Sequence, residues 1–131
     1  MHFRSLFAAA LVLAAGTSIA QTYPSKQVRF LVGFPAGGAT DVVARAISQN
    51  LSEALGQPVV VDNRAGAASN IAAEMVVLAT KGRYTIFMGT VSTAINPSLY
   101  KKLAYNALKD FSAVTQVTDT PFMFVTHPSL P

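Results

Sequence analysis

The sequence predicts an α/β fold built on a parallel β-sheet. Three short apolar runs have the composition of buried strands, and each is followed by a segment rich in glycine, small or hydroxyl residues. Between them lie two segments whose apolar residues recur at helical spacing. Alternating strands and helices are typical of parallel sheets joined by right-handed crossovers. Because ligands bind outside the carboxyl ends of such strands, the segments that follow them are the candidate functional site.

The first predicted strand, turn and helix extend from residue 28 to residue 55. Val28–Phe34 is almost wholly apolar, as expected of a strand covered on both faces. Residues 35–39 then break the strand, because proline cannot donate to a ladder and paired glycines allow tight turns and close ligand approach. Thr40 or Asp41 is expected to cap the helix. Free N–H groups at this helix start make the turn an anion-binding corner in principle.

The same patterns predict the remaining elements. Ser69 or Asn70 is expected to cap the second helix. The elements, in order, are a strand at 59–61, a loop at 62–70, a helix from 71 to near 82, a strand at 84–88, a loop at 89–93, a short helical turn at 96–100, and strands at 111–117 and 122–126.

The first twenty residues are typical of a secretory signal peptide. A short basic start precedes an apolar stretch at 6–15, and Ser18-Ile19-Ala20 is a small-residue cleavage pattern. The apolar stretch is too short to span a bilayer comfortably, although a membrane anchor or buried helix is the alternative. Cleavage would leave residues 21–131 as one domain. Without any cysteine to carry a lipid, the mature chain is expected to be free of the membrane.

Composition and missing motifs argue against several functions. The net charge is +4, but the basic residues are scattered, so we expect no nucleic-acid partner. Neither GxxxxGK[ST] nor GxGxxG occurs, which argues against a nucleotide cofactor. Only His127 remains after signal cleavage, and GxSxG and HExxH are absent. We therefore expect no catalytic residues, no metal site and no cofactor, and we predict a binding protein instead of an enzyme.

Several motifs together resemble a known family. They are YPSKQVRFLVGFPAGGATDVVAR, LGQPVVVDNRAGAASNIAAE, RYTIFMGT, INPSLYKKLAYNALKDFSAVTQV and the closing VTHPSLP. They are similar to the Bug-type receptors, the periplasmic substrate-binding components of tripartite tricarboxylate transporters. The resemblance implies a periplasmic location, a two-lobed Venus-flytrap fold of type II, and membrane transporter subunits as partners. It also implies a small carboxylate, amino acid or related ligand in the interdomain cleft, held partly through ordered water.

The resemblance also implies a set of ligand-binding residues in the three segments after the strands. Members of the family are more than twice as long, so this chain is expected to be a truncated N-terminal lobe whose second lobe is missing. A non-functional fragment and a one-lobe periplasmic sensor or interaction module remain alternatives. The implied ligand-binding residues are Phe34, Pro35, Ala36, Gly37, Gly38, Ala39, Thr40, Asp41, Ala68, Ser69, Asn70, Thr90 and Thr93.

Overall fold

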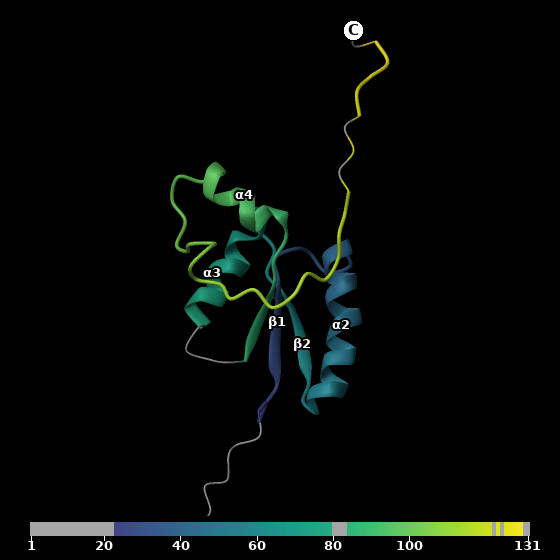
Figure 1. Ribbon diagram of the computed structural model, residues 1–131, viewed down its shortest axis with the longest axis vertical. Coiled ribbons are helices and arrows are strands. Elements are labelled where there is room, and N and C mark those ends of the chain that lie inside the picture. The colour runs from purple at the N-terminus through teal and green to yellow at the C-terminus, as the bar shows by residue number, and fades with distance from the viewer. Residues whose placement is uncertain (1–22, 80–83, 122, 124, 130–131) are drawn as a thin grey trace, which may run out of the picture.

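In the part of the chain that the structure describes, three parallel strands form one sheet with helices on both faces (Figure 1). The computed structural model describes residues 23–79, 84–121, 123 and 125–129. The sheet order is β2-β1-β3, so the first strand is central, and the predicted parallel α/β class is confirmed. The elements are β1 (Val28–Val32), α2 (Ala39–Leu55), β2 (Val59–Asn63), η1 (Ala67–Ser69), α3 (Asn70–Leu78), β3 (Thr85–Met88) and α4 (Val91–Leu99).

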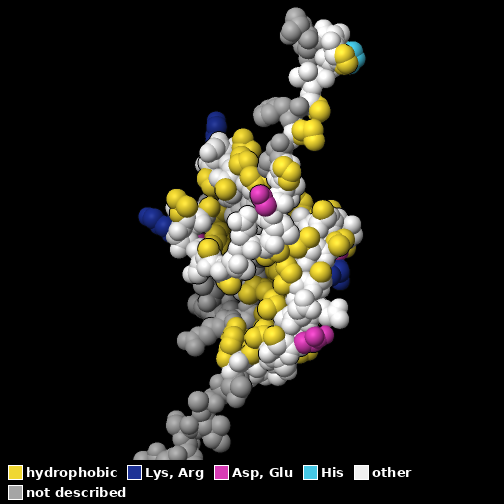
Figure 2. All heavy atoms as spheres, turned by 45° about the vertical axis from the view of Figure 1, so that its right-hand side comes forward, with side chains coloured by type: hydrophobic (Ala, Val, Ile, Leu, Met, Phe, Trp, Pro, Cys, Tyr) yellow, Lys and Arg dark blue, Asp and Glu magenta, His cyan; other side chains and the backbone are white. Residues whose placement is uncertain are grey.

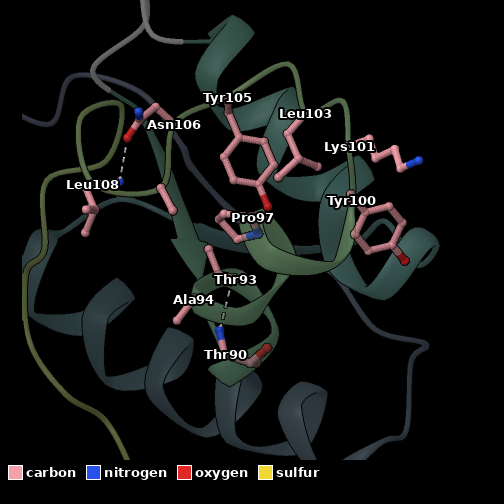
Figure 3. A pocket seen from close by; sticks show the side chains of 11 residues that line it. Thr90, Thr93, Ala94, Pro97, Tyr100, Lys101, Leu103, Tyr105, Asn106 and Leu108 are labelled. Carbon is pink, nitrogen blue, oxygen red and sulfur yellow. Dashed lines mark hydrogen bonds between the residues drawn. The ribbon is translucent and has the colours of Figure 1, made fainter.

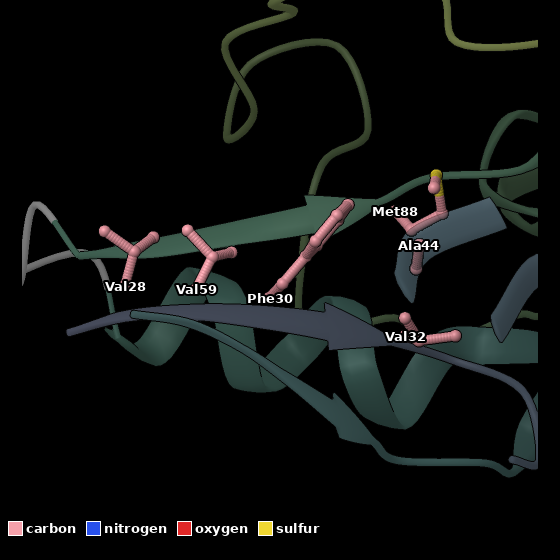
Figure 4. Packing of buried hydrophobic residues seen from close by; sticks show 6 residues of the cluster. All are labelled: Val28, Phe30, Val32, Ala44, Val59 and Met88. Carbon is pink, nitrogen blue, oxygen red and sulfur yellow. The ribbon is translucent and has the colours of Figure 1, made fainter. Parts of the chain in front are cut away.

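The core lies on the two faces of β1. Val28, Phe30 and Val32 alternate along the strand and pack with Ala44 of α2, which covers one face (Figure 4). Leu31 is fully buried and points to the opposite face, where α3 contacts β1 and β3. Burying each such side chain contributes about 1.5–3 kcal/mol. Coverage on both faces explains why this strand is an uninterrupted apolar run.

Two predicted helix starts were wrong. The N-cap of α2 is Gly38, not Thr40 or Asp41, and it makes no side-chain cap hydrogen bond. The Asp41 carboxylate instead reaches back to the Gly37 N–H at 2.8 Å, so it acts from inside the first turn of the helix. The helix α4 begins at Val91, where a loop was expected, and Pro97 lies inside it. The Thr93 N–H donates to the Thr90 carbonyl at 2.9 Å, which starts this helix early.

The strand predicted at 111–117 does not form. Among the described residues, none from 111 to 121 makes a backbone–backbone hydrogen bond, and those of 122–126 that the structure describes lie in no strand. Phe111 anchors the start of the segment by stacking on Phe87, with ring centroids 5.7 Å apart. Beyond it, Val114 is 88% exposed, and the chain extends away from the domain (Figure 1). A strand needs backbone hydrogen bonds to a neighbouring strand, and this segment meets β3 through the Phe111 side chain without making such bonds to any described residue.

Other predictions fall outside the described residues. The signal peptide at 1–20 and the end predicted for the second helix near 82 both lie there, while α3 itself ends at Leu78. Within the described part of the chain, no helix is long and apolar enough to cross a membrane. Figure 2 shows hydrophobic side chains gathered across one face and along the extended C-terminal segment.

Candidate ligand-binding site

Three turns meet at one edge of the sheet. Val32, the last residue of β1, lies beside Asn63 of β2 and Met88 of β3, so all three strands end at this edge. The first turn (34–38) leads into α2, the second turn (64–69) into α3, and the third turn (89–90) into α4. Three helix N-termini therefore surround the edge where parallel sheets bind ligands.

A buried carboxylate holds the first turn in shape. Asp41 is only 2% exposed, and its Oδ2 accepts hydrogen bonds from the Gly37 N–H at 2.8 Å and Arg45 Nε at 2.9 Å. Its Oδ1 accepts from Asn63 Nδ2 at 2.9 Å, and the same amide nitrogen donates to the Phe34 carbonyl at 3.1 Å. Both carboxylate oxygens are thus occupied by the protein itself.

These donors set the charge of the turn. Hydrogen bonds from Arg45, Gly37 and Asn63, in that order of importance, hold the pKa of Asp41 well below its ordinary 3.8. The carboxylate is therefore ionised at neutral pH, and it is not a proton donor or acceptor there. Arg45 neutralises it, so the charge does not oppose an anion bound above the turn.

Backbone N–H groups at the start of α2 remain available. The first N–H groups of an α-helix have no intrahelical acceptor. For Ala39 and Thr40, no described residue accepts their N–H groups either. The aligned peptide dipoles also make this end of the helix positive. Together these features favour an anion or a carboxylate oxygen.

The second turn has an unusual backbone. Ala67, Ala68 and Ser69 have φ values of 47°, 51° and 74°, which place three consecutive non-glycine residues in the left-handed region. Such a conformation costs about 1–2 kcal/mol per residue and persists only where the surrounding structure enforces it. Such strain is concentrated at functional sites in proteins.

Close packing against β1 enforces this turn. A Cβ atom added to Gly33 would lie 1.8 Å from Ser69 Oγ and 2.8 Å from Ser69 Cα. Ser69 is 1% exposed, and its Oγ has no hydrogen-bond partner among the described residues. A buried hydroxyl without a partner costs about 1–3 kcal/mol, so this atom is a candidate for contact with a bound group.

A polar cluster lies behind the second turn. Asn70 is 4% exposed, and its Oδ1 accepts hydrogen bonds from Asn96 Nδ2 and the Tyr105 hydroxyl, each at 2.6 Å. Sequence reasoning selected Asn70 but missed Asn96 and Tyr105. In the sequence, Asn96 was only the first residue of a predicted helical turn, and Tyr105 carried no signal.

The third turn borders a cavity of about 620 Å³ between α4 and residues 100–108 (Figure 3). Thr93 Oγ1 accepts a hydrogen bond from the Thr90 N–H at 3.4 Å, and both threonines line the cavity. Figure 3 shows Tyr105 beside Pro97, with its hydroxyl directed toward α4. The Tyr100 hydroxyl points away from Tyr105. The cavity also has Lys101, Leu103 and Asn106 in its wall.

Comparison with known proteins assigns the chain to a family. Residues 43–131 match the family described as the tripartite tricarboxylate transporter family receptor. The chain belongs to this family. Its members are substrate-binding receptors for transport and not enzymes, and they are periplasmic. The resemblance to Bug-type receptors in the sequence is therefore confirmed.

Individual relatives agree with the family match. Protein BugT of Bordetella pertussis is 39% identical over 127 residues, which are 95% of this chain and 39% of BugT. MatC from Rhodopseudomonas palustris, solved with bound malate, is 37% identical with a TM-score of 0.64, covering 68% of this chain and 31% of MatC. R. palustris Rpa4515, solved with adipate, is 39% identical with a TM-score of 0.62, covering 66% of this chain and 29% of that protein. The chain thus spans well under half the length of each.

The structure brings the predicted ligand-binding residues of this receptor together. They all lie at the carboxyl edge of the sheet or in the first turns of the helices that begin at that edge. Residues 35–39 are exposed, while Phe34 is half-buried and packs against the core. Asp41, Ser69 and Asn70 are buried, Ala68 is exposed, and Thr90 and Thr93 are half-buried. Their roles in ligand binding stay predictions. No group of three or more His, Cys, Asp or Glu residues that could hold a metal ion occurs in the described part of the chain.

Proposed function

We propose that the chain binds a small carboxylate at the carboxyl edge of its sheet, as the N-terminal lobe of an extracytoplasmic solute receptor. The receptor would pass this solute to a tripartite transporter in the membrane. The observation that carries the proposal is the set of three helix starts around one sheet edge, with available N–H groups at Ala39 and Thr40. Malate and adipate, which are bound by the related MatC and Rpa4515, are both dicarboxylates.

Neutral donors suit a carboxylate that must be released again. Hydrogen bonds from backbone N–H groups to a carboxylate are charge-assisted and short, so they bind well without a buried cation. Arg45, a cation beside the first turn, is already paired with Asp41. We therefore expect the charge of the ligand to be balanced mainly by helix ends and N–H dipoles.

Isothermal titration calorimetry of the purified chain with malate and adipate tests the proposal. A diamine of the same length as adipate is the control ligand, because it matches the ligand in size but has the opposite charge. We expect binding heat from a dicarboxylate and none from the diamine. A folded sample that gives no heat with either dicarboxylate, or the same heat with the diamine, would contradict the proposed function.

Ala39→Pro tests the donors directly. Ala39 is the first residue of α2, and Gly38 before it has φ −75° and ψ 167°, a conformation compatible with a following proline. The substitution removes one N–H and keeps the helix, so we expect affinity to fall about fivefold to tenfold with little change in Tm. Ala39→Gly keeps the N–H and is the matched control, for which we expect near-native affinity.

A further inference from the structure

The buried cluster of Asn70, Asn96 and Tyr105 has only one consistent direction of hydrogen bonding. We propose that Asn96 and Tyr105 are positioning residues that fix the Asn70 amide with its Nδ2 as a donor to the bound ligand. The inference rests on the proposed function and adds to it. Asn96 and Tyr105 lie outside the three turns, and the ligand atom bound at the second turn would be a hydrogen-bond acceptor.

A single backbone carbonyl sets the direction. The amide nitrogen of Asn96 lies 2.9 Å from the Ala68 carbonyl and 2.6 Å from the Asn70 side chain. A carbonyl oxygen only accepts hydrogen bonds, so the amide group of Asn96 must present its nitrogen there. The two hydrogens of that nitrogen then serve Ala68 and Asn70, and the Asn70 atom that faces it must be the oxygen Oδ1.

The remaining contact of Asn70 follows from this choice. Because the atom at 2.6 Å from the Tyr105 hydroxyl is Oδ1, the hydroxyl must donate. Both acceptor positions of Oδ1 are then filled by buried donors, since Asn96 is 1% and Tyr105 is 7% exposed. Rotating the Asn70 amide by half a turn would break both bonds, so Asn96 and Tyr105 lock its orientation.

The Asn70 amide nitrogen has a different environment from its oxygen. Asn70 is 96% buried, and no described residue accepts a hydrogen bond from its Nδ2. Asn70 is also the first residue of α3, directly after the unpartnered Ser69 hydroxyl. This place in the fold therefore offers N–H donors at a positive helix end, which favours a carboxylate oxygen and disfavours an ammonium group.

Two isosteric substitutions test the direction of the cluster without any ligand. Asn70→Asp keeps an oxygen that accepts from Asn96 and Tyr105, so we expect its Tm to stay within about 4 °C of the wild type. Asn96→Asp places carboxylate oxygens against the Ala68 carbonyl and Asn70 Oδ1, so we expect Tm to fall by about 10 °C or more. The reverse ranking would show the opposite direction and overturn the inference.

Ligand binding tests the role of Nδ2. Tyr105→Phe removes one of the two bonds that lock Asn70, and we expect the Kd for malate or adipate to rise about threefold to tenfold. Tyr100→Phe is the matched control, because the Tyr100 hydroxyl points away from Tyr105 (Figure 3), and we expect its Kd to be unchanged. Asn70→Asp should abolish dicarboxylate binding in a protein that stays folded.

The two proposals fail in different ways. If the wild type binds neither dicarboxylate, the proposed function is wrong, and the Tm ranking of Asn70→Asp and Asn96→Asp still decides the orientation of Asn70. If the wild type binds but Tyr105→Phe and Asn70→Asp bind equally well, the proposed function stands and the inference about Asn70 is overturned.

Discussion

The first turn and the second turn both lead from a strand end into a helix, but they satisfy their polar groups differently. In the first turn, the Asp41 carboxylate takes three hydrogen bonds from the protein, and the turn is braced by charge. In the second turn, three residues hold left-handed conformations, and Ser69 Oγ has no partner among the described residues. The described hydrogen bonds of the Asn70 side chain all go to its Oδ1. We infer that both turns offer donors to a ligand. The first turn offers backbone N–H groups beside a carboxylate that is already paired, whereas the second turn also offers side-chain groups.

The largest effect is expected where the two turns meet. Gly33→Ala would place a Cβ 1.8 Å from Ser69 Oγ, and also 2.8 Å from its Cα, so a simple rotation of the hydroxyl gives no relief. We expect the free energy of unfolding to fall by about 3 kcal/mol or more, as measured by urea denaturation.

Gly89→Ala is the matched control for this substitution. Gly89 follows β3 as Gly33 follows β1, but an added Cβ there would meet nothing closer than 3.8 Å. We expect its free energy of unfolding to change by less than about 1 kcal/mol. If both variants are equally stable, the packing of the second turn onto β1 is not the constraint that we describe.

The next largest effect on stability is expected from the Asn63 hydrogen bonds that hold the first turn. Asn63→Ala removes the amide that donates to both the Phe34 carbonyl and Asp41 Oδ1, so we expect a loss of about 2 kcal/mol in the free energy of unfolding. Asn50→Ala is the control, because Asn50 is an exposed amide on α2. Equal stability of the two variants would show that the first turn does not depend on the hydrogen bonds of Asn63.

A smaller effect of opposite sign is expected in the second turn. Ala68→Gly relieves the left-handed conformation at φ 51°, and we expect a gain of about 0.5–1 kcal/mol after the added flexibility of the unfolded chain is counted. Ala36→Gly in the first turn is the control. Its φ is not positive, so we expect a loss of about 0.5–1 kcal/mol on chemical denaturation. A loss for both variants would mean that the second turn is not strained.

The sequence predicted those parts of the molecule that depend on residues close together in the chain. Apolar runs and breaking residues located all three strands of the sheet and the helices α2 and α3, and they placed the candidate site at the strand ends. The cluster around Asn70 was missed, because its partners are 26 and 35 residues away in the chain and only the fold brings them together. The strand expected at 111–117 has suitable residues, but its formation depends on a neighbouring strand.

The smallest effect is a change in the pH dependence of stability. Because the pKa of folded Asp41 lies below its ordinary 3.8, the ionised carboxylate stabilises the fold above that pH. This contribution is lost as pH falls below 3.8 toward the folded-state pKa. Removing the Asn63 donor leaves Arg45 and Gly37 and moves the folded pKa partway back toward the ordinary value.

The wild type should therefore lose more stability than Asn63→Ala when the pH is lowered from about 5 to about 2. Urea denaturation across this range measures the difference in slope. Asp62, whose pKa is also lowered, contributes equally to both proteins because its partners are Arg29 and Arg64. Parallel pH profiles would show that Asn63 does not help to keep Asp41 ionised. The charge stabilisation that distinguishes the first turn from the strained second turn would then come from Arg45 and Gly37 alone.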